Sequence, residues 1–146
     1  MKCQEIELSH EVVTKVENKI RIMVVEDEKI IALDIQSVLM GFGFDVCAVA
    51  SSGEECIELA RKTIPDLILM DVKLKGNMTG ITAAKTIKKA MNIPVIYLTA
   101  YGDKDTITKA NGSNSFGMIS KPFGEDELQN TIKNTFAQIK KHPQIN

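Results

Sequence analysis

Residues 20–28 read Ile-Arg-Ile-Met-Val-Val-Glu-Asp-Glu, an apolar run rich in β-branched side chains that ends in three acids. Short runs of this kind, separated by helical stretches, are typical of strands buried in a parallel sheet. Three further apolar runs each precede one polar residue: residues 67–70 before Asp71, 95–98 before Thr99 and 117–120 before Lys121. The carboxyl ends of parallel strands meet at one edge of the sheet, where ligands bind. We therefore expect Glu26, Asp27, Asp71, Thr99 and Lys121 to converge, a set that suits a divalent metal and a phosphoryl group.

Helical patterns alternate with these runs, and residues 45–49 supply one more apolar run, which makes five predicted strands. The expected helices cover residues 29–40, the stretch from Ser52 to just before Pro65, and residues 80–90, 104–110 and 125–140. Ser52 and Glu55 have the spacing of a capping box, and Gly41 is expected to stop the first helix. The helix at 104–110 has poor helical propensity because it contains Thr106 and Thr108.

This alternation predicts an α/β fold of the (βα)5 type, a doubly wound parallel sheet of five strands with flavodoxin-like topology. Right-handed crossovers place helices on both faces of such a sheet, and the expected strand order is 2-1-3-4-5. Strands 1 and 3 are then neighbours. That order brings Glu26 and Asp27 next to Asp71, although 44 residues separate the two aspartates.

Composition is ordinary for one soluble domain: 146 residues, 44% hydrophobic and 25% charged. A net charge of −1 and a pI near 6.1 give no indication of nucleic acid or an anionic membrane as a partner. No apolar stretch approaches the roughly 18 residues of a transmembrane helix. Three cysteines, Cys3, Cys47 and Cys56, form no CxxC pair, which favours a reducing, cytoplasmic location over a disulfide framework.

Four motifs in this order resemble the response-regulator receiver domain of two-component signalling. They are Val24-Val25-Glu26-Asp27-Glu28, Leu69-Met70-Asp71-Val72, Leu98-Thr99-Ala100 and Ser120-Lys121-Pro122-Phe123. The resemblance covers residues 19–141, which we expect to form the receiver domain. Residues 1–18 are then an N-terminal arm or short helix, and residues 142–146 a C-terminal tail.

The resemblance implies a Mg²⁺ ion at the acidic edge. Glu26 and Asp27 would be the metal-binding pair, with Asp71 as the third carboxylate and the backbone carbonyl of Lys73 as a further ligand. An acidic turn that only caps the first helix is the alternative for Glu26, Asp27 and Glu28 taken alone, because acids are favoured near helix N-termini. Mg²⁺ prefers oxygen ligands and is often held by a few carboxylates together with phosphate oxygens.

The resemblance also implies roles in phosphoryl transfer. Asp71 would accept the phosphoryl group, Thr99 would donate its hydroxyl to a phosphoryl oxygen, and Lys121 would neutralise the phosphoryl charge. The Lys121–Pro122 peptide bond is expected to be cis. Neutralisation and positioning are what phosphoryl transfer requires of a protein.

Two positions depart from the family pattern. Met118 stands where the family usually has an aromatic residue or histidine, so we do not expect the aromatic rotamer change that the family uses in signalling. Tyr101 lies two residues after Thr99, on a loop expected to move on phosphorylation. We therefore predict that Tyr101 and the weak helix at 104–110 carry the conformational signal.

The resemblance implies a histidine kinase or phosphotransfer protein as phosphodonor. The output would be a protein partner on the surface of the fourth helix, fifth strand and fifth helix, and a weak homodimer is compatible with this surface. We expect no nucleic-acid or membrane contact and no catalysis beyond the protein's own phosphorylation and dephosphorylation. The alternatives are a phosphate sink or relay module, or the receiver fragment of a hybrid sensor kinase.

Three other folds are excluded at this stage. A haloacid-dehalogenase-type phosphatase needs a second acid two residues after its nucleophile, where this chain has Lys73. A flavodoxin needs a phosphate-binding first loop, whereas Glu26, Asp27 and Glu28 would repel a phosphate. A dinucleotide-binding fold needs G-x-G-x-x-G after the first strand, and that motif is missing.

Overall fold

The computed structural model describes residues 19–100 and 117–141. They form one parallel sheet of five strands in the order β2-β1-β3-β4-β5, which confirms the predicted topology. The strands are β1 (Arg21–Val25), β2 (Asp45–Ala50), β3 (Leu67–Asp71), β4 (Val95–Thr99) and β5 (Gly117–Ser120). The predicted helix at 104–110, Tyr101, and the predicted arm and tail lie outside the described residues.

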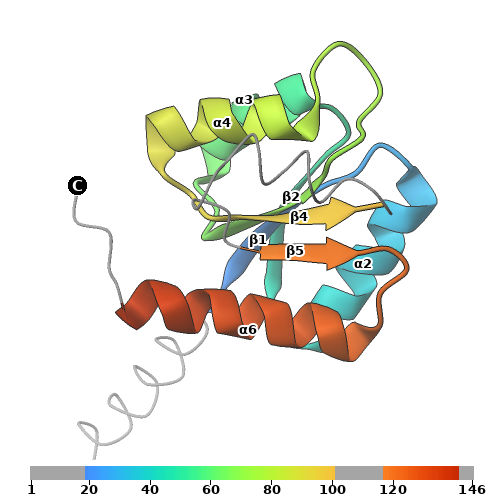
Figure 1. The fold of residues 1–146 in the computed structure, drawn as a ribbon, viewed down its shortest axis with the longest axis vertical. Helices are drawn as coiled ribbons and strands as arrows, with labels where there is room; N and C mark the ends of the chain where they lie inside the picture. Colours follow the sequence, from blue (N-terminus) through green and yellow to red (C-terminus); the bar gives the residue numbers. More distant parts are fainter. Residues whose placement is uncertain (1–18, 101–116, 142–146) are drawn as a thin grey trace, which may run out of the picture.

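Four helices are described: α2 (Lys29–Gly41), α3 (Gly53–Thr63), α4 (Gly80–Met91) and α6 (Glu125–Lys141). Figure 1 shows α3 and α4 on one face of the sheet and α2 and α6 on the other. Each described element begins and ends within one residue of its prediction, because apolar periodicity marks these boundaries. In the described part of the chain, no helix has the length and apolar character needed to span a membrane.

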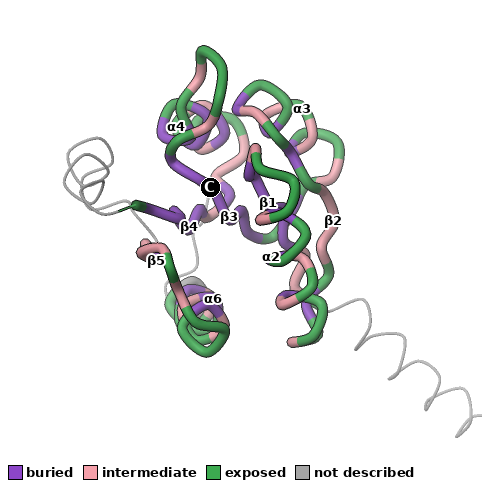
Figure 2. Tube along the Cα trace, turned by 90° about the vertical axis from the view of Figure 1, so that its right-hand side faces the viewer, coloured by how far each residue is buried: buried purple, intermediate pink, exposed green. Residues whose placement is uncertain are grey.

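The sheet separates two apolar cores. One contains the inward side chains of α3 and α4, including Cys56, Ala60 and Ile87, and the other contains those of α2 and α6, including Leu39 and Ile132. Figure 2 shows the central strands β1, β3 and β4 largely buried, the edge strands β2 and β5 mostly half-buried, and the outer sides of the helices exposed. Strands β1, β3 and β4 are apolar on both faces because helices cover both.

Local hydrogen bonds explain where α3 begins. The Glu55 N–H donates to Ser52 Oγ at 3.1 Å, which confirms Ser52 as the N-cap. The Glu55 carboxylate accepts from the Ser51 N–H at 2.7 Å, one residue before the position that an ideal capping box would use. The two acids in the first turn, Glu54 and Glu55, also suit the positive end of the helix.

The first helix ends at Gly41, one residue beyond its predicted end at Met40, but Gly41 does not take the left-handed capping conformation. Gly41 is the last residue of α2, and the Phe42 N–H continues the helical bonding to the Val38 carbonyl oxygen at 3.2 Å. Gly43, with φ of 90°, is the residue that takes the left-handed conformation. This later turn places Phe44 in the core beneath α2, where it is 8% exposed.

Gly80 lies at the start of α4, in close contact with the end of β3. A Cβ atom built there would clash with the backbone oxygen of Asp71 and lie 2.9 Å from Met70 Cγ. The backbone oxygen cannot rotate away, so only glycine fits at this position. Gly80 therefore sets how closely α4 packs behind the strand that carries Asp71.

We predict that Gly80→Ala lowers the free energy of unfolding by about 1–3 kcal/mol, the usual cost of overpacking a filled interior. Urea denaturation followed by circular dichroism measures this change. Gly124→Ala is the matched control, because a Cβ there meets no atom within 4 Å. Equal stability of Gly80→Ala and wild type would show that the helix can move away from Asp71 at no cost.

Candidate metal and phosphoacceptor site

Three carboxylates meet at the carboxyl edge of the sheet. Glu26 directly follows β1, and Asp71 ends β3, the strand paired with β1 through Val25 and Met70. Glu26, Asp27 and Asp71 each offer an oxygen atom, and these atoms lie within 4.8 Å of one another. Glu26 is 3% and Asp71 7% exposed, so both carboxylates are largely removed from water. The predicted convergence of these three residues is therefore present in the structure.

A cavity of about 420 Å³ opens over these carboxylates. Among the residues that line it are four acids, Glu26, Asp27, Glu28 and Asp71, and three lysines, Lys73, Lys75 and Lys121. Acidic and basic groups thus nearly balance in the cavity, with one more carboxylate than ammonium groups. A cavity with this lining suits a cation together with an anion better than it suits an apolar ligand.

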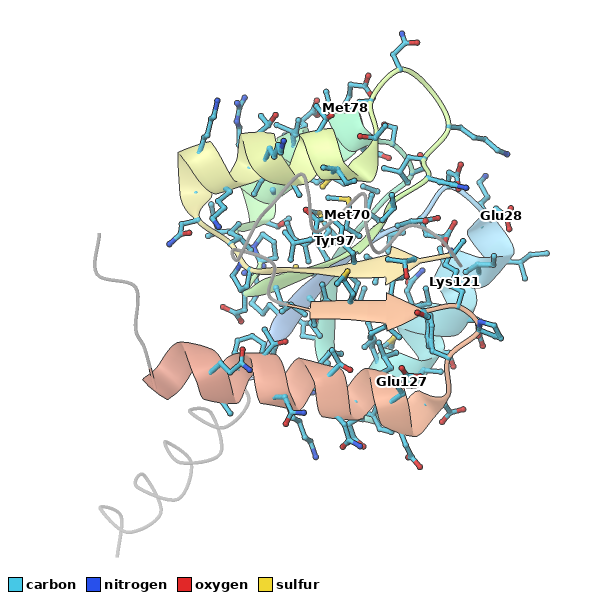
Figure 3. All side chains as sticks on the ribbon, in the orientation of Figure 1. Glu28, Met70, Met78, Tyr97, Lys121 and Glu127 are labelled. Atoms are coloured by element: carbon cyan, nitrogen blue, oxygen red, sulfur yellow. The ribbon has the colours of Figure 1, made fainter. Side chains whose placement is uncertain are left out.

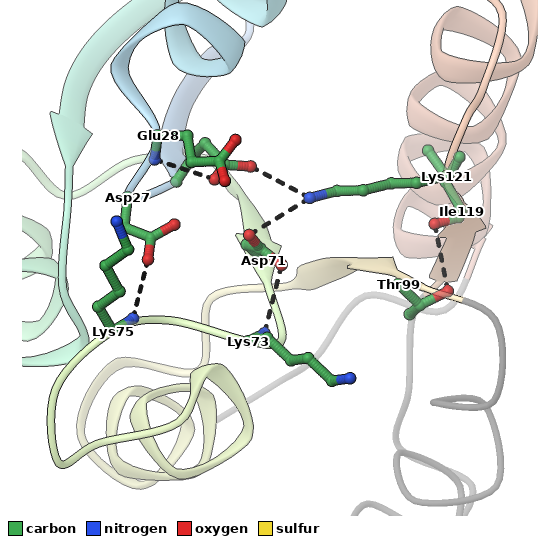
Figure 4. Close-up of polar contacts among 9 residues, drawn as sticks. Asp27, Glu28, Asp71, Lys73, Lys75, Thr99, Ile119 and Lys121 are labelled. Carbon is green, nitrogen blue, oxygen red and sulfur yellow. Dashed lines mark hydrogen bonds and ion pairs between the residues drawn. The ribbon is translucent and has the colours of Figure 1, made fainter.

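Backbone N–H groups donate to each of the three clustered carboxylates, those of Glu26, Asp27 and Asp71 (Figure 4). The Glu28 N–H donates to Glu26 Oε2 at 3.1 Å, and the Lys73 N–H donates to Asp71 Oδ1 at 3.3 Å. Asp27 Oδ2 accepts from the Lys75 N–H at 2.9 Å. Each of these three carboxylates therefore accepts a hydrogen bond from a backbone N–H through one oxygen atom, and this bond orients the carboxylate toward the cavity.

Lys121 links two of the acids. Its Nζ lies 3.2 Å from Glu26 Oε1 and 3.3 Å from Asp71 Oδ2. Lys121 directly follows β5, and its N–H donates to the Thr99 carbonyl oxygen at 2.7 Å. The peptide bond to Pro122 is cis, as the resemblance implies. The ammonium group thus occupies the space between Glu26 and Asp71.

Thr99 lies at the same edge but not in the cavity lining. It is fully buried at the end of β4, and its hydroxyl donates to the Ile119 carbonyl oxygen at 3.4 Å (Figure 4). Met118 pairs with Tyr97 across β4 and β5 and packs against the core beneath α3 and α4. The predicted roles of Thr99, Met118 and the Lys73 carbonyl stay predictions, and Tyr101 lies outside the described residues.

The electrostatics of the site reflect crowded acids. The pKa of Glu26 is raised to about 7, mainly by burial and also by the charge of Asp71, although the Glu28 N–H and Lys121 act in the opposite direction. Burial lowers the pKa of Lys121, but Asp71 and Glu26 more than offset this and leave it above its usual value. The acids therefore depend on a proton or a nearby cation to coexist.

Sequence patterns did not identify the Lys75 contact with Asp27. The bond uses a backbone N–H, so the identity of the side chain carries no signal for it. The nearest hint in the sequence is Gly76, whose φ of 103° permits the turn that follows Lys75. Lys75 nevertheless connects the loop after β3 to the acidic segment after β1.

Known proteins are similar to this chain in sequence. The transcriptional regulatory protein PdtaR of Mycobacterium tuberculosis is 33% identical over 108 residues, which cover 74% of this chain and 52% of PdtaR. The phyllosphere-induced regulator PhyR of Methylorubrum extorquens is 34% identical over 103 residues, which cover 70% of this chain and 38% of PhyR. The chain thus spans about half the length of these curated relatives or less.

Solved structures agree with the relatives. The signal receiver domain of a modulated diguanylate cyclase from Desulfovibrio desulfuricans superimposes with a TM-score of 0.77 at 30% identity, over 84% of this chain and 98% of that domain. A response regulator receiver domain from Clostridium thermocellum gives 0.75 at 27% identity, over 83% and 97% of the two chains. The family model described as the response regulator receiver domain matches residues 22–133, and the chain belongs to this family.

Proposed function

We propose that Asp71 accepts a phosphoryl group in a Mg²⁺-dependent reaction and that this modification switches a protein-interaction surface. The observation that carries the proposal is the position of Asp71. Its oxygen atoms lie within reach of two further carboxylates and 3.3 Å from the ammonium group of Lys121. A nucleophile, a metal-binding pair and a fixed cation therefore share one cavity.

The residues present fit a magnesium ion. Carboxylate oxygen atoms are the hard ligands that Mg²⁺ prefers, and the ion retains several waters of its own. Glu26, Asp27 and Asp71 would hold the ion, with the Lys73 carbonyl as the further ligand that the resemblance implies. The raised pKa of Glu26 supports this assignment, because a cation would stabilise the charged carboxylate that burial and the nearby charge of Asp71 disfavour. The bound ion supplies charge neutralisation for the phosphoryl oxygens.

The chain's own residues divide the chemistry among them. An Asp71 carboxylate oxygen attacks the phosphorus atom of a phosphohistidine on the donor protein. The new O–P bond forms as the N–P bond breaks, and the imidazole nitrogen keeps the electron pair. Lys121 neutralises a phosphoryl oxygen, and for this Nζ must leave Glu26 and follow the transferred group. Thr99 turns its hydroxyl from Ile119 to another phosphoryl oxygen, a charge-assisted hydrogen bond.

The proposed partners follow from this chemistry. A sensor histidine kinase or phosphotransfer protein donates the phosphoryl group, and a downstream protein reads the surface that includes β5 and α6. We propose further that the protein catalyses only its own phosphorylation and dephosphorylation. We place it in the cytoplasm, where reduced cysteines such as the buried Cys56 are stable.

Phosphorylation of Asp71 is directly measurable. Incubation with acetyl phosphate and Mg²⁺ should add one phosphoryl group per chain by intact-mass spectrometry. Asp71→Asn should abolish the addition, and Asp45→Asn, an exposed acid at the opposite end of the sheet, should not. Equal labelling of Asp71→Asn and wild type would assign the phosphoacceptor elsewhere.

Stability should depend on pH through Glu26. Its pKa of about 7 lies above the ordinary 4.5, so the folded state binds more protons than the unfolded state between these values. In metal-free buffer the free energy of unfolding should therefore fall as pH rises from 4.5 to 7, by about 1–3 kcal/mol. Urea denaturation across this range should give a smaller fall for Glu26→Gln.

Added Mg²⁺ should remove this fall for wild type, because the ion favours the charged carboxylate. Glu54→Gln, an exposed acid on α3, is the control and should keep the wild-type dependence on pH. The double variant Glu26→Gln/Asp27→Asn should be more stable than wild type without metal and should bind Mg²⁺ more weakly. Wild-type Mg²⁺ affinity in that double variant would place the metal site elsewhere.

Lys121 should respond to the phosphoryl group without accepting it. Lys121→Ala should still be phosphorylated by acetyl phosphate, more slowly than wild type, since the nucleophile remains. Beryllofluoride, which mimics the phosphoryl group, should then cause smaller NMR chemical-shift changes along β5 than in wild type. Changes of equal size in both proteins would show that Lys121 has no part in the conformational response.

A further inference from the structure

The loop between β3 and α4, residues 72–79, lies on one side of the cavity, and its two ends are close together. Its two ends are joined by a hydrogen bond from the Gly80 N–H to the Val72 carbonyl oxygen at 3.0 Å. Lys73, Leu74 and Lys75 line the cavity from this loop. Because the base is closed, the path of the rest of the loop depends on where its two arms are anchored.

One arm is anchored to the acidic site. The Lys75 N–H donates to Asp27 Oδ2 at 2.9 Å, a bond between residues 48 positions apart in the sequence. Leu74, next to it, is half-buried and packs against the core beneath α3 and α4. Any shift of this arm would therefore move the group that holds the Asp27 carboxylate.

The other arm is anchored to α3 by Met78 (Figure 3). Met78 is half-buried against the same core and lies directly over Gly53, the first residue of α3. A Cβ atom built on Gly53 would lie 2.8 Å from Met78 Cγ, 2.9 Å from Sδ and 3.0 Å from Cβ. Three successive atoms of the Met78 side chain thus pack against Gly53. Rotation of the terminal methyl group alone could not remove the clash with a Cβ atom added there.

We infer that Met78 is a positioning residue for the metal site, acting through the Lys75 N–H on Asp27. The contact of Met78 with Gly53 fixes the position of the loop at the cavity. It thereby keeps the Lys75 N–H within hydrogen-bonding distance of Asp27. The inference rests on the proposed Mg²⁺ site, because Asp27 is one of its ligands. Gly53 has a matching role, since only a residue without a Cβ leaves space for Met78.

A role limited to core filling makes a different prediction. Met78 would then change the global free energy of unfolding when truncated, with no selective effect on Asp27 or on metal binding. Asn77, an exposed neighbour on the same loop, is the matched control for the loop itself. Met78→Leu is the conservative variant, since it keeps an apolar side chain of similar volume.

The first measurement is amide hydrogen exchange of Lys75 in the metal-free full chain. Met78→Ala should speed exchange of this amide by about tenfold, while amides in the centre of β3 keep the protection set by global unfolding. Met78→Leu should restore slow exchange, and Asn77→Ala should not alter it. An unchanged Lys75 amide in Met78→Ala would overturn the inference.

The second measurement is a Mg²⁺ titration by calorimetry. Met78→Ala and Gly53→Ala should each weaken Mg²⁺ binding several-fold, although neither residue lies among the proposed ligands. In the double variant, Gly53→Ala should add little to the effect of Met78→Ala, because the shortened side chain loses the two closest contacts with the new Cβ, at 2.8 and 2.9 Å, and keeps only that of its own Cβ at 3.0 Å. Fully additive effects would contradict a shared contact.

The outcomes separate this inference from the proposed function. No Mg²⁺ binding by wild type would overturn both. Wild-type binding together with undiminished binding by Met78→Ala would overturn only the positioning role. Weaker binding accompanied by faster Lys75 exchange, with both restored in Met78→Leu, would support it.

Discussion

Repulsion among three carboxylates at one edge of the sheet is the constraint on which the rest of the site depends. Glu26 and Asp71 are both nearly excluded from water, and burial of unpaired charge costs free energy. Lys121 lies between them and supplies the compensating cation. The same ammonium group is the one that would follow a transferred phosphoryl group, so the resting contact and the proposed reaction compete for one side chain.

The fold tolerates three neighbouring carboxylates because the apolar cores lie on the two faces of the sheet and not at its carboxyl edge. Both faces of the central strands are covered by helices, and two apolar cores hold the sheet in place. The polar groups at the carboxyl ends can then be destabilising without unfolding the domain. Gly80 and Gly53 both permit close packing near the site because neither has a Cβ. Gly80 lets the start of α4 lie against the end of β3, and Gly53 lets Met78 lie against the start of α3.

The sequence predicted the strands, their order and the convergence of Glu26, Asp27 and Asp71. Burial of the strands requires apolar runs, and these runs can be recognised in a single sequence. The sequence did not identify Gly43 as the residue with positive φ after α2, because the turn there accompanies the burial of Phe44, a tertiary contact that spacing does not encode. It also missed the Lys75 N–H, because a backbone donor leaves no residue-specific signal. The hydroxyl direction of Thr99 depends on a rotamer, which no spacing in the sequence encodes.

A crystal structure of the full chain with Mg²⁺ and beryllofluoride tests the central claim most directly. The account predicts beryllium bonded to an Asp71 oxygen and a metal ion in contact with Glu26, Asp27 and Asp71. It also predicts that Lys121 Nζ has left Glu26 and lies on a fluoride. A beryllofluoride group on another residue, or a metal ion bound away from these three acids, would contradict it.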